Sequence, residues 1–67
     1  MTYEENIGKT AGKVWAFLRD HGKTSLSGVE KSVDAPRGVV VMAIGWLARE
    51  GKLEFGQENR STQVWLR

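Results

Sequence analysis

The sequence predicts a small α+β domain, ordered helix, short strand, helix, helix and two-stranded hairpin, which is the architecture of a winged helix-turn-helix. Two observations carry this prediction. The stretch Pro36–Gly51 has a helix start, a helical apolar stripe and a glycine stop. The stretches 52–57 and 62–67 then alternate in polarity as strands do, around a polar turn at 58–61. In this fold the hairpin is the wing, and Pro36–Gly51 takes the place of the recognition helix.

The first helix is expected over about Ile7–Asp20, where apolar residues recur at helical spacing. Residues 1–6 are polar and are expected to fray. Gly22 is suited to a left-handed cap at the end of this helix. Gly8 and Gly12 lie inside it, where each glycine costs about 1 kcal/mol relative to alanine. Either the first turn is loose, or another element packs close to these glycines. They share one face, which could admit a partner helix, although this spacing is a weak signal in a water-soluble protein.

A short strand is expected over Lys23–Leu26, followed by a short helix that ends near Val33. Ser27 and Glu30 have the spacing of a capping box, in which the serine oxygen accepts from the backbone and the carboxylate reaches back. This spacing predicts that the second helix begins at Ser27.

The third helix is expected to be capped by Asp34 or Ala35, with Pro36 in its first turn, where a missing N–H is tolerated. Gly51 is expected to stop it. Its core side is expected to contain five residues at helical spacing: Val40, Ala43, Ile44, Leu47 and Ala48.

In the hairpin, Leu53 and Phe55 are expected to share a face with Val64 and Leu66. Strict alternation then places Trp65 on the opposite face. Trp65 is therefore expected to point outward unless another element or a second subunit covers it.

Length and composition bound the function. Sixty-seven residues make one domain, 1–67, with a small core and no room for a large active-site cleft. The absence of cysteine excludes disulfides and thiolate chemistry. No apolar run is long enough to span a membrane, and the acidic start lacks the pattern of a signal peptide. The expected location is the cytoplasm.

The net charge of +2 is unevenly placed. Residues 1–35 carry five basic and five acidic side chains, whereas residues 36–67 carry five basic and three acidic ones. The excess therefore lies on the third helix and the hairpin, where a nucleic-acid-binding protein would have it. It is small enough to be ordinary surface charge as well.

Two runs, AGKVW at 11–15 and AIGWLAREGK at 43–52, resemble a family of small stand-alone winged helix proteins of bacteria and archaea whose function is unknown. The resemblance extends over nearly the whole chain. It implies the fold and a transcription-regulator-like role, and it brings no catalytic residues. Leu47 and Gly51 also match the L-x-x-x-G step into the wing that is seen in DNA-binding winged helices.

Double-stranded DNA is the first candidate partner. In winged helices the third helix enters the major groove and the wing tip reaches the backbone or the minor groove. The expected contacts are Arg37 and Arg49 on the helix, with Lys52 and Arg60 beyond it and Lys31 as an addition. The third helix has no Asn, Gln, Ser or Thr, the other side chains that read base edges.

The alternative is protein interaction or self-association without DNA binding. Val39, Met42 and Trp46 are expected to lie near one another on the outside of the third helix, and Trp65 offers further apolar surface. Trp46 either folds over the wing to complete the core or is covered by a partner. A homodimer is the simplest cover for such a face.

Catalysis is not predicted. His21 is the single histidine, expected at the end of the first helix, where positive charge is favourable. Ser27 has no base at a sensible spacing and is interpreted as a cap. No metal, cofactor or small-molecule substrate is expected, because no cluster of ligands or phosphate-binding loop is present.

Overall fold

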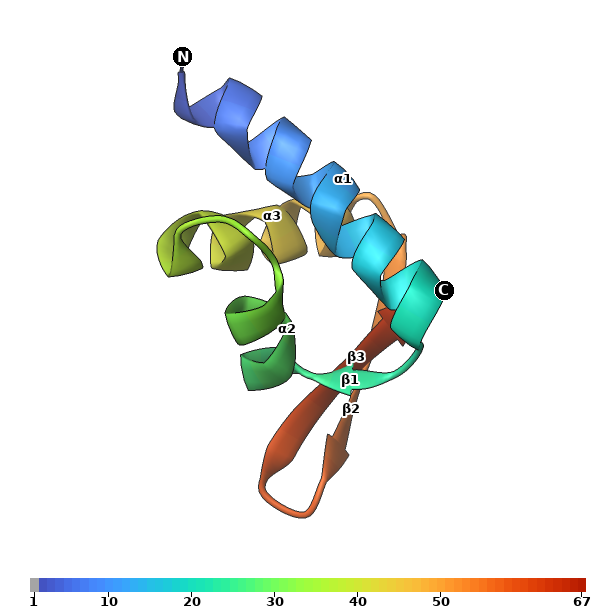
Figure 1. Cartoon of the computed structure of the whole chain (residues 1–67). Helices are drawn as coiled ribbons and strands as arrows, with labels where there is room; N and C mark the ends of the chain where they lie inside the picture. Colours follow the sequence, from blue (N-terminus) through green and yellow to red (C-terminus); the bar gives the residue numbers. More distant parts are fainter. Residues whose placement is uncertain (1) are drawn as a thin grey trace.

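The computed structural model describes residues 2–67 as three helices and a three-stranded antiparallel sheet (Figure 1). The elements are α1 (Tyr3–His21), β1 (Thr24–Ser25), α2 (Leu26–Ser32), α3 (Arg37–Arg49), β2 (Leu53–Glu58) and β3 (Ser61–Leu66). This order confirms the predicted α+β winged helix-turn-helix. In the bounds of the elements, the differences from prediction lie chiefly at the helix starts.

Helix α1 begins at Tyr3 rather than at the predicted Ile7. Thr2 caps it, because its hydroxyl accepts the backbone N–H three residues further on at 3.1 Å. Two acidic side chains in the first turn suit the positive end of the helix dipole. Of residues 1–6, expected to fray, those from Tyr3 onward are helical, and Met1 lies outside the described residues.

The end of α1 is as predicted. Gly22 has a φ of 77° and donates its backbone N–H to the Leu18 carbonyl at 2.8 Å. His21 lies in the last turn, with its Nδ1 3.0 Å from the Phe17 carbonyl oxygen and its ring stacked on Phe17. The histidine therefore closes the helix.

Helix α2 is capped by Ser25, not by Ser27. The Ser25 hydroxyl accepts from the backbone N–H of Gly28 at 3.1 Å, so β1 shrinks to two residues and Leu26 becomes the first helical residue. The predicted capping box is absent, because Ser27 lies inside the helix, and the Glu30 carboxylate pairs with Arg37 of α3.

The start of α3 also differs from prediction. Pro36 is itself the cap residue, outside the helix, and no side chain caps the first turn. Asp34 is exposed, and its backbone carbonyl accepts from Lys13 Nζ at 2.8 Å. Gly51 follows the helix with a φ of 73°, which confirms the predicted stop.

The core lies between α1, α2, α3 and the inner face of the sheet. Helix α3 packs chiefly on α1 and also contacts α2 and β2. Of the five predicted core residues of α3, Val40, Ala43, Ile44 and Leu47 are buried, while Ala48 is half-buried. The core cluster is Ala11, Val14, Leu18, Val29, Val33, Val40, Ala43, Ile44, Leu47, Leu53 and Val64.

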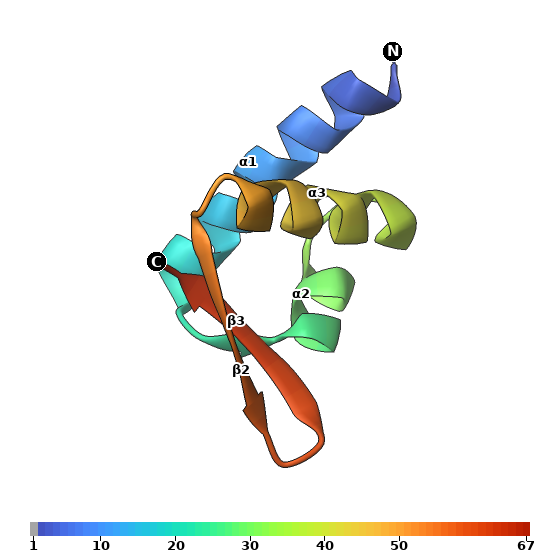
Figure 2. The same cartoon turned by 180° about the vertical axis from the view of Figure 1, so that it is seen from behind.

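The sheet has the order β1-β3-β2, and its hairpin projects beyond the helices (Figure 2). Leu53 pairs with Leu66 and Phe55 with Val64, as predicted. Val64, on the central strand, is fully buried, whereas Phe55, opposite it on the edge strand β2, is exposed. At the tip, Asn59 takes a φ of 55°, a conformation that asparagine tolerates.

Leu18→Ala should remove about 2–5 kcal/mol from the free energy of unfolding, because this side chain is fully enclosed. The total free energy of unfolding of a domain of this size is little larger than that. Urea unfolding measures the change. Val41→Ala, at an exposed position, is the control and should change it by less than about 0.5 kcal/mol. A loss below about 1 kcal/mol for Leu18→Ala would contradict the described core.

Ser25→Ala should destabilise the domain by about 1 kcal/mol, because it removes the cap of α2. Ser27→Ala is the matched control and should have almost no effect, since Ser27 is exposed within the first turn. The same unfolding experiment compares them. A larger destabilisation by Ser27→Ala than by Ser25→Ala would indicate instead that Ser27 caps α2, as the capping-box spacing predicts.

Candidate functional site

The side of α3 turned away from the core is almost wholly apolar. It consists of Gly38, Val41, Met42, Gly45 and Arg49, here called the outer face of α3. Val41 is 48% exposed and Met42 41% exposed. No atom approaches within 4 Å of the position that a Cβ would take on either glycine. Arg49 alone on this face could donate a hydrogen bond to a base or a phosphate.

The predicted DNA-contacting residues differ in how free they are. Arg37 pairs with Glu30 of α2, with Nε and Oε1 3.0 Å apart, and Glu30 is largely buried. Arg49, Lys52, Arg60 and Lys31 are exposed, and no ion pair to them is present within residues 2–67. Three arginines, Arg37, Arg49 and Arg60, are therefore accessible on α3 and at the wing tip, although Arg37 is also paired with the Glu30 carboxylate.

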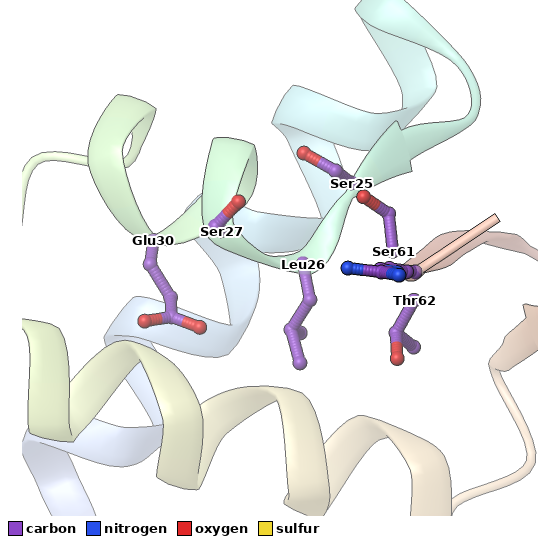
Figure 3. A pocket seen from close by; sticks show the side chains of 7 residues that line it. Ser25, Leu26, Ser27, Glu30, Ser61 and Thr62 are labelled. Atoms are coloured by element: carbon purple, nitrogen blue, oxygen red, sulfur yellow. The ribbon is translucent and has the colours of Figure 1, made fainter. Parts of the chain in front are cut away.

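A shallow pocket separates α2 from the wing tip (Figure 3). Its lining is mostly hydroxyl groups and charge, from Ser25, Leu26, Ser27, Glu30, Arg60, Ser61 and Thr62. Figure 3 shows the Glu30 carboxylate directed toward α3. Arg37, Glu30 and Arg60 thus lie on one side of the molecule. Hydroxyl and guanidinium groups are donors that suit phosphate oxygens.

Lys52 does not belong to that side. It lines a groove along α1, here called the α1 groove, together with Gly8, Ala11, Gly12, Trp15, Trp46 and Leu47. The predicted set of DNA contacts is therefore split. Arg37 and Arg60 border α2, Arg49 lies on the outer face of α3, and Lys52 faces α1.

The predicted protein interface needs one correction. Val39 is buried rather than exposed, because it faces α1 and shares a pocket lining with Thr10 and Lys13. Val41 takes its place on the surface. Three consecutive valines at 39–41 show no periodicity among themselves. Only their angular positions around the helix relative to the buried Val40 could have indicated which of Val39 and Val41 is buried.

Trp46 adopts neither of the two expected arrangements in full. It does not fold over the wing but lies beside Ile7 and Gly8 of α1. It remains 45% exposed and so does not complete the core. Trp46 forms the boundary between the α1 groove and the outer face of α3.

Trp65 is half-buried on the outward face of the hairpin. The Lys23 ammonium lies 4.6 Å from the centre of its ring, and Lys23 also pairs with Glu58 at 3.2 Å. The indole covers Gly56, where a Cβ would lie only 2.9 Å from a ring carbon. Trp65 is thus covered in part by its own chain, which leaves less of it for a partner than alternation predicts.

Within residues 2–67, no group of three or more His, Cys, Asp or Glu side chains is arranged to hold a metal ion. In the same part of the chain, every buried side-chain nitrogen and oxygen has a hydrogen-bond partner. Among the described helices, none combines the length and apolar character needed to cross a membrane. The candidate features described above are the outer face of α3, the pocket beside α2 and the α1 groove.

The chain resembles two other proteins over most of its length. It is 48% identical over 64 residues to the uncharacterized protein MJ1608 of Methanocaldococcus jannaschii, covering 91% of this chain and 90% of that one. The NMR structure of protein BT2368 from Bacteroides thetaiotaomicron superposes with a TM-score of 0.83 at 28% identity. That match covers 97% of this chain and 79% of BT2368.

The expected family resemblance is confirmed by a match over residues 1–66 to the model of a winged helix-turn-helix domain, DUF2582. Proteins with this fold are typically not enzymes, and they commonly bind DNA. The chain belongs to the DUF2582 family of winged helix-turn-helix domains.

Proposed function

We propose that this chain is a transcription-regulator-like protein that binds double-stranded DNA through the phosphate backbone. Arg37, Arg49 and Arg60 are the contacts, placed on α3 and at the wing tip. The observation that carries the proposal is the accessibility of these three guanidinium groups, at the positions from which winged helices touch DNA. Guanidinium groups bind phosphate oxygens in a bidentate manner, which favours arginine for this task.

The outer face of α3 sets the kind of recognition. Discrimination between base pairs depends on hydrogen bonds to base edges, supplied chiefly by Arg, Lys, Asn, Gln, Ser and Thr. On this face only Arg49 is of that kind, whereas Val41 and Met42 offer contact with a thymine methyl at most. We therefore infer that the chain distinguishes one duplex sequence from another weakly.

Glu30 opposes binding in this arrangement. Its carboxylate neutralises Arg37 and borders the pocket that Arg60 also lines. A phosphate that binds Arg37 must displace Glu30 from it, and one that enters this pocket meets the repulsion of the Glu30 carboxylate. The Glu30–Arg37 pair is thus a competitor of DNA within the protein, and its removal should strengthen the complex.

Arg60→Ala should weaken duplex binding several-fold, and Glu30→Gln should strengthen it, because the first removes a phosphate contact and the second frees Arg37. With three contacts, log affinity should fall against log salt with a slope near about −2.7, and Arg60→Ala should lower the slope by about 1. Fluorescence anisotropy with a labelled duplex at several salt concentrations measures both. Arg19→Ala, on α1, removes an equal charge elsewhere and should have the smaller effect.

Met42→Arg should raise duplex affinity and steepen the salt slope by about 1, because it adds a donor at the centre of the outer face of α3. Asp20→Asn is the matched control: it raises the net charge equally but lies on α1, and its effect should be much smaller. Equal effects of the two variants would mean that net charge alone governs binding and that α3 does not face the DNA.

A second candidate is binding of another protein without DNA. The exposure of Val41 and Met42 favours it, because an apolar surface of this kind is typical of protein contacts. The same anisotropy experiment separates the two. Weak binding that is insensitive to salt would remove the DNA proposal and leave this one.

A further inference from the structure

Residues 3–9 of α1, which precede the buried Thr10 and Ala11, are mostly exposed. Figures 1 and 2 both show this segment extending beyond α3, away from the body of the domain. Tyr3 is 71% exposed, and Ile7 is only partly buried. Short helical segments without tertiary contacts are marginal in water, and most helical stability in proteins comes from packing. This segment therefore has surface to offer a partner.

The α1 groove runs beside this segment. Gly8 and Gly12 form part of its lining, and Trp15 and Trp46 are partly exposed along it. No atom lies within 4 Å of the Cβ position of either glycine. Packing inside one copy of the chain therefore does not explain two glycines in the middle of a helix. A helix laid against them would be able to approach unusually closely.

A second pocket adjoins the α1 groove and shares Gly8 and Trp46 with it. Glu4 lines this second pocket but not the groove, whereas Lys52 lines the groove together with Gly12 and Trp15 but not the second pocket. The combined surface therefore has an acidic and a basic side chain on either side of Gly8 and Trp46. Neither Glu4 nor Lys52 takes part in an ion pair within residues 2–67. The surface is thus self-complementary: reversed end to end, it presents its acidic end to its own basic end.

We propose that the α1 groove is occupied by α1 of a second copy of the chain, antiparallel, across a two-fold axis near Gly8. Glu4 lies one helical turn before Gly8, and Gly12 one turn after it, about 6 Å to each side. Pairing the two helices at Gly8 therefore places Glu4 of the partner subunit over Gly12, next to Lys52. The axis repeats this contact, so each dimer has two such charge pairs, and Trp46 of each copy closes against the opposing helix.

This assembly is independent of DNA binding. The wing tip lies at the opposite end of the molecule from the start of α1 (Figures 1 and 2). Arg60 and the pocket beside α2 therefore remain open in the dimer. Self-association measured without DNA tests this proposal alone, whatever the outcome of the duplex titrations.

Sedimentation equilibrium of the full chain, without DNA, provides the test. The wild-type chain should be a dimer, and Gly8→Gln should raise the dissociation constant by about tenfold or more, because a side chain then blocks the helix crossing. Its thermal midpoint as a diluted monomer should not fall, since the position is open and glutamine is the better helix former. Gly45→Gln, the same change on the outer face of α3, should leave the dimer intact.

Charge reversal identifies the orientation. Glu4→Lys and Lys52→Glu should each weaken the dimer, and the double variant should recover most of the loss, because it exchanges the two ends of every pair. A wild-type chain that is monomeric at every concentration would overturn the proposal. So would a Gly8→Gln dimer of unchanged affinity, or a double variant that is weaker than both single ones.

Discussion

The packing of α3 against α1 is the contact on which the rest of the structure depends. One stripe of α3, centred on Val40, Ile44 and Leu47, is buried against α1 and the inner face of the sheet. No disulfide or metal site is present among the described residues to replace it. Because the stripe occupies one side of the helix, it also decides which residues of α3 are left outside. The same contact that holds the fold therefore defines the surface available for function.

That surface is unusual for a recognition helix. Gly38, Val41, Met42 and Gly45 provide shape and apolar contact but no hydrogen bonds from their side chains. The polar contacts of the molecule lie around it, at Arg49, at the wing tip and along α2. In the proposed complex, the chain would bind a duplex through its phosphates, and α3 would read little of the base sequence.

The order of elements and most of the core follow from local signals. The periodicity of α3, Gly51 after it and the alternation of β2 and β3 each act over a few residues, so the sequence alone predicts them. The cap of α2 does not follow in this way. Ser25 and Ser27 are chemically equal, and local spacing does not show that Glu30 pairs with Arg37 of α3, a tertiary contact, rather than with the start of its own helix.

The same limit applies to the candidate site. The sequence indicates which arginines are available, but not that Glu30 would neutralise one of them or that Lys52 would face α1. Val39 was predicted to be exposed but is buried. The prediction failed because three consecutive valines do not indicate which of them points to α1. The glycines of α1 were a visible signal. Only the structure shows that the space above them is empty within one copy of the chain.

We propose that the chain binds DNA through the phosphate backbone of the duplex and not through the base edges. The most direct test compares its affinity for two duplexes of equal length and unrelated sequence, measured by anisotropy at one fixed salt concentration. We expect the two affinities to agree within a few-fold and both to fall steeply when the salt concentration is raised. A preference of a thousand-fold or more for one duplex, the range of specific DNA-binding proteins, would contradict it.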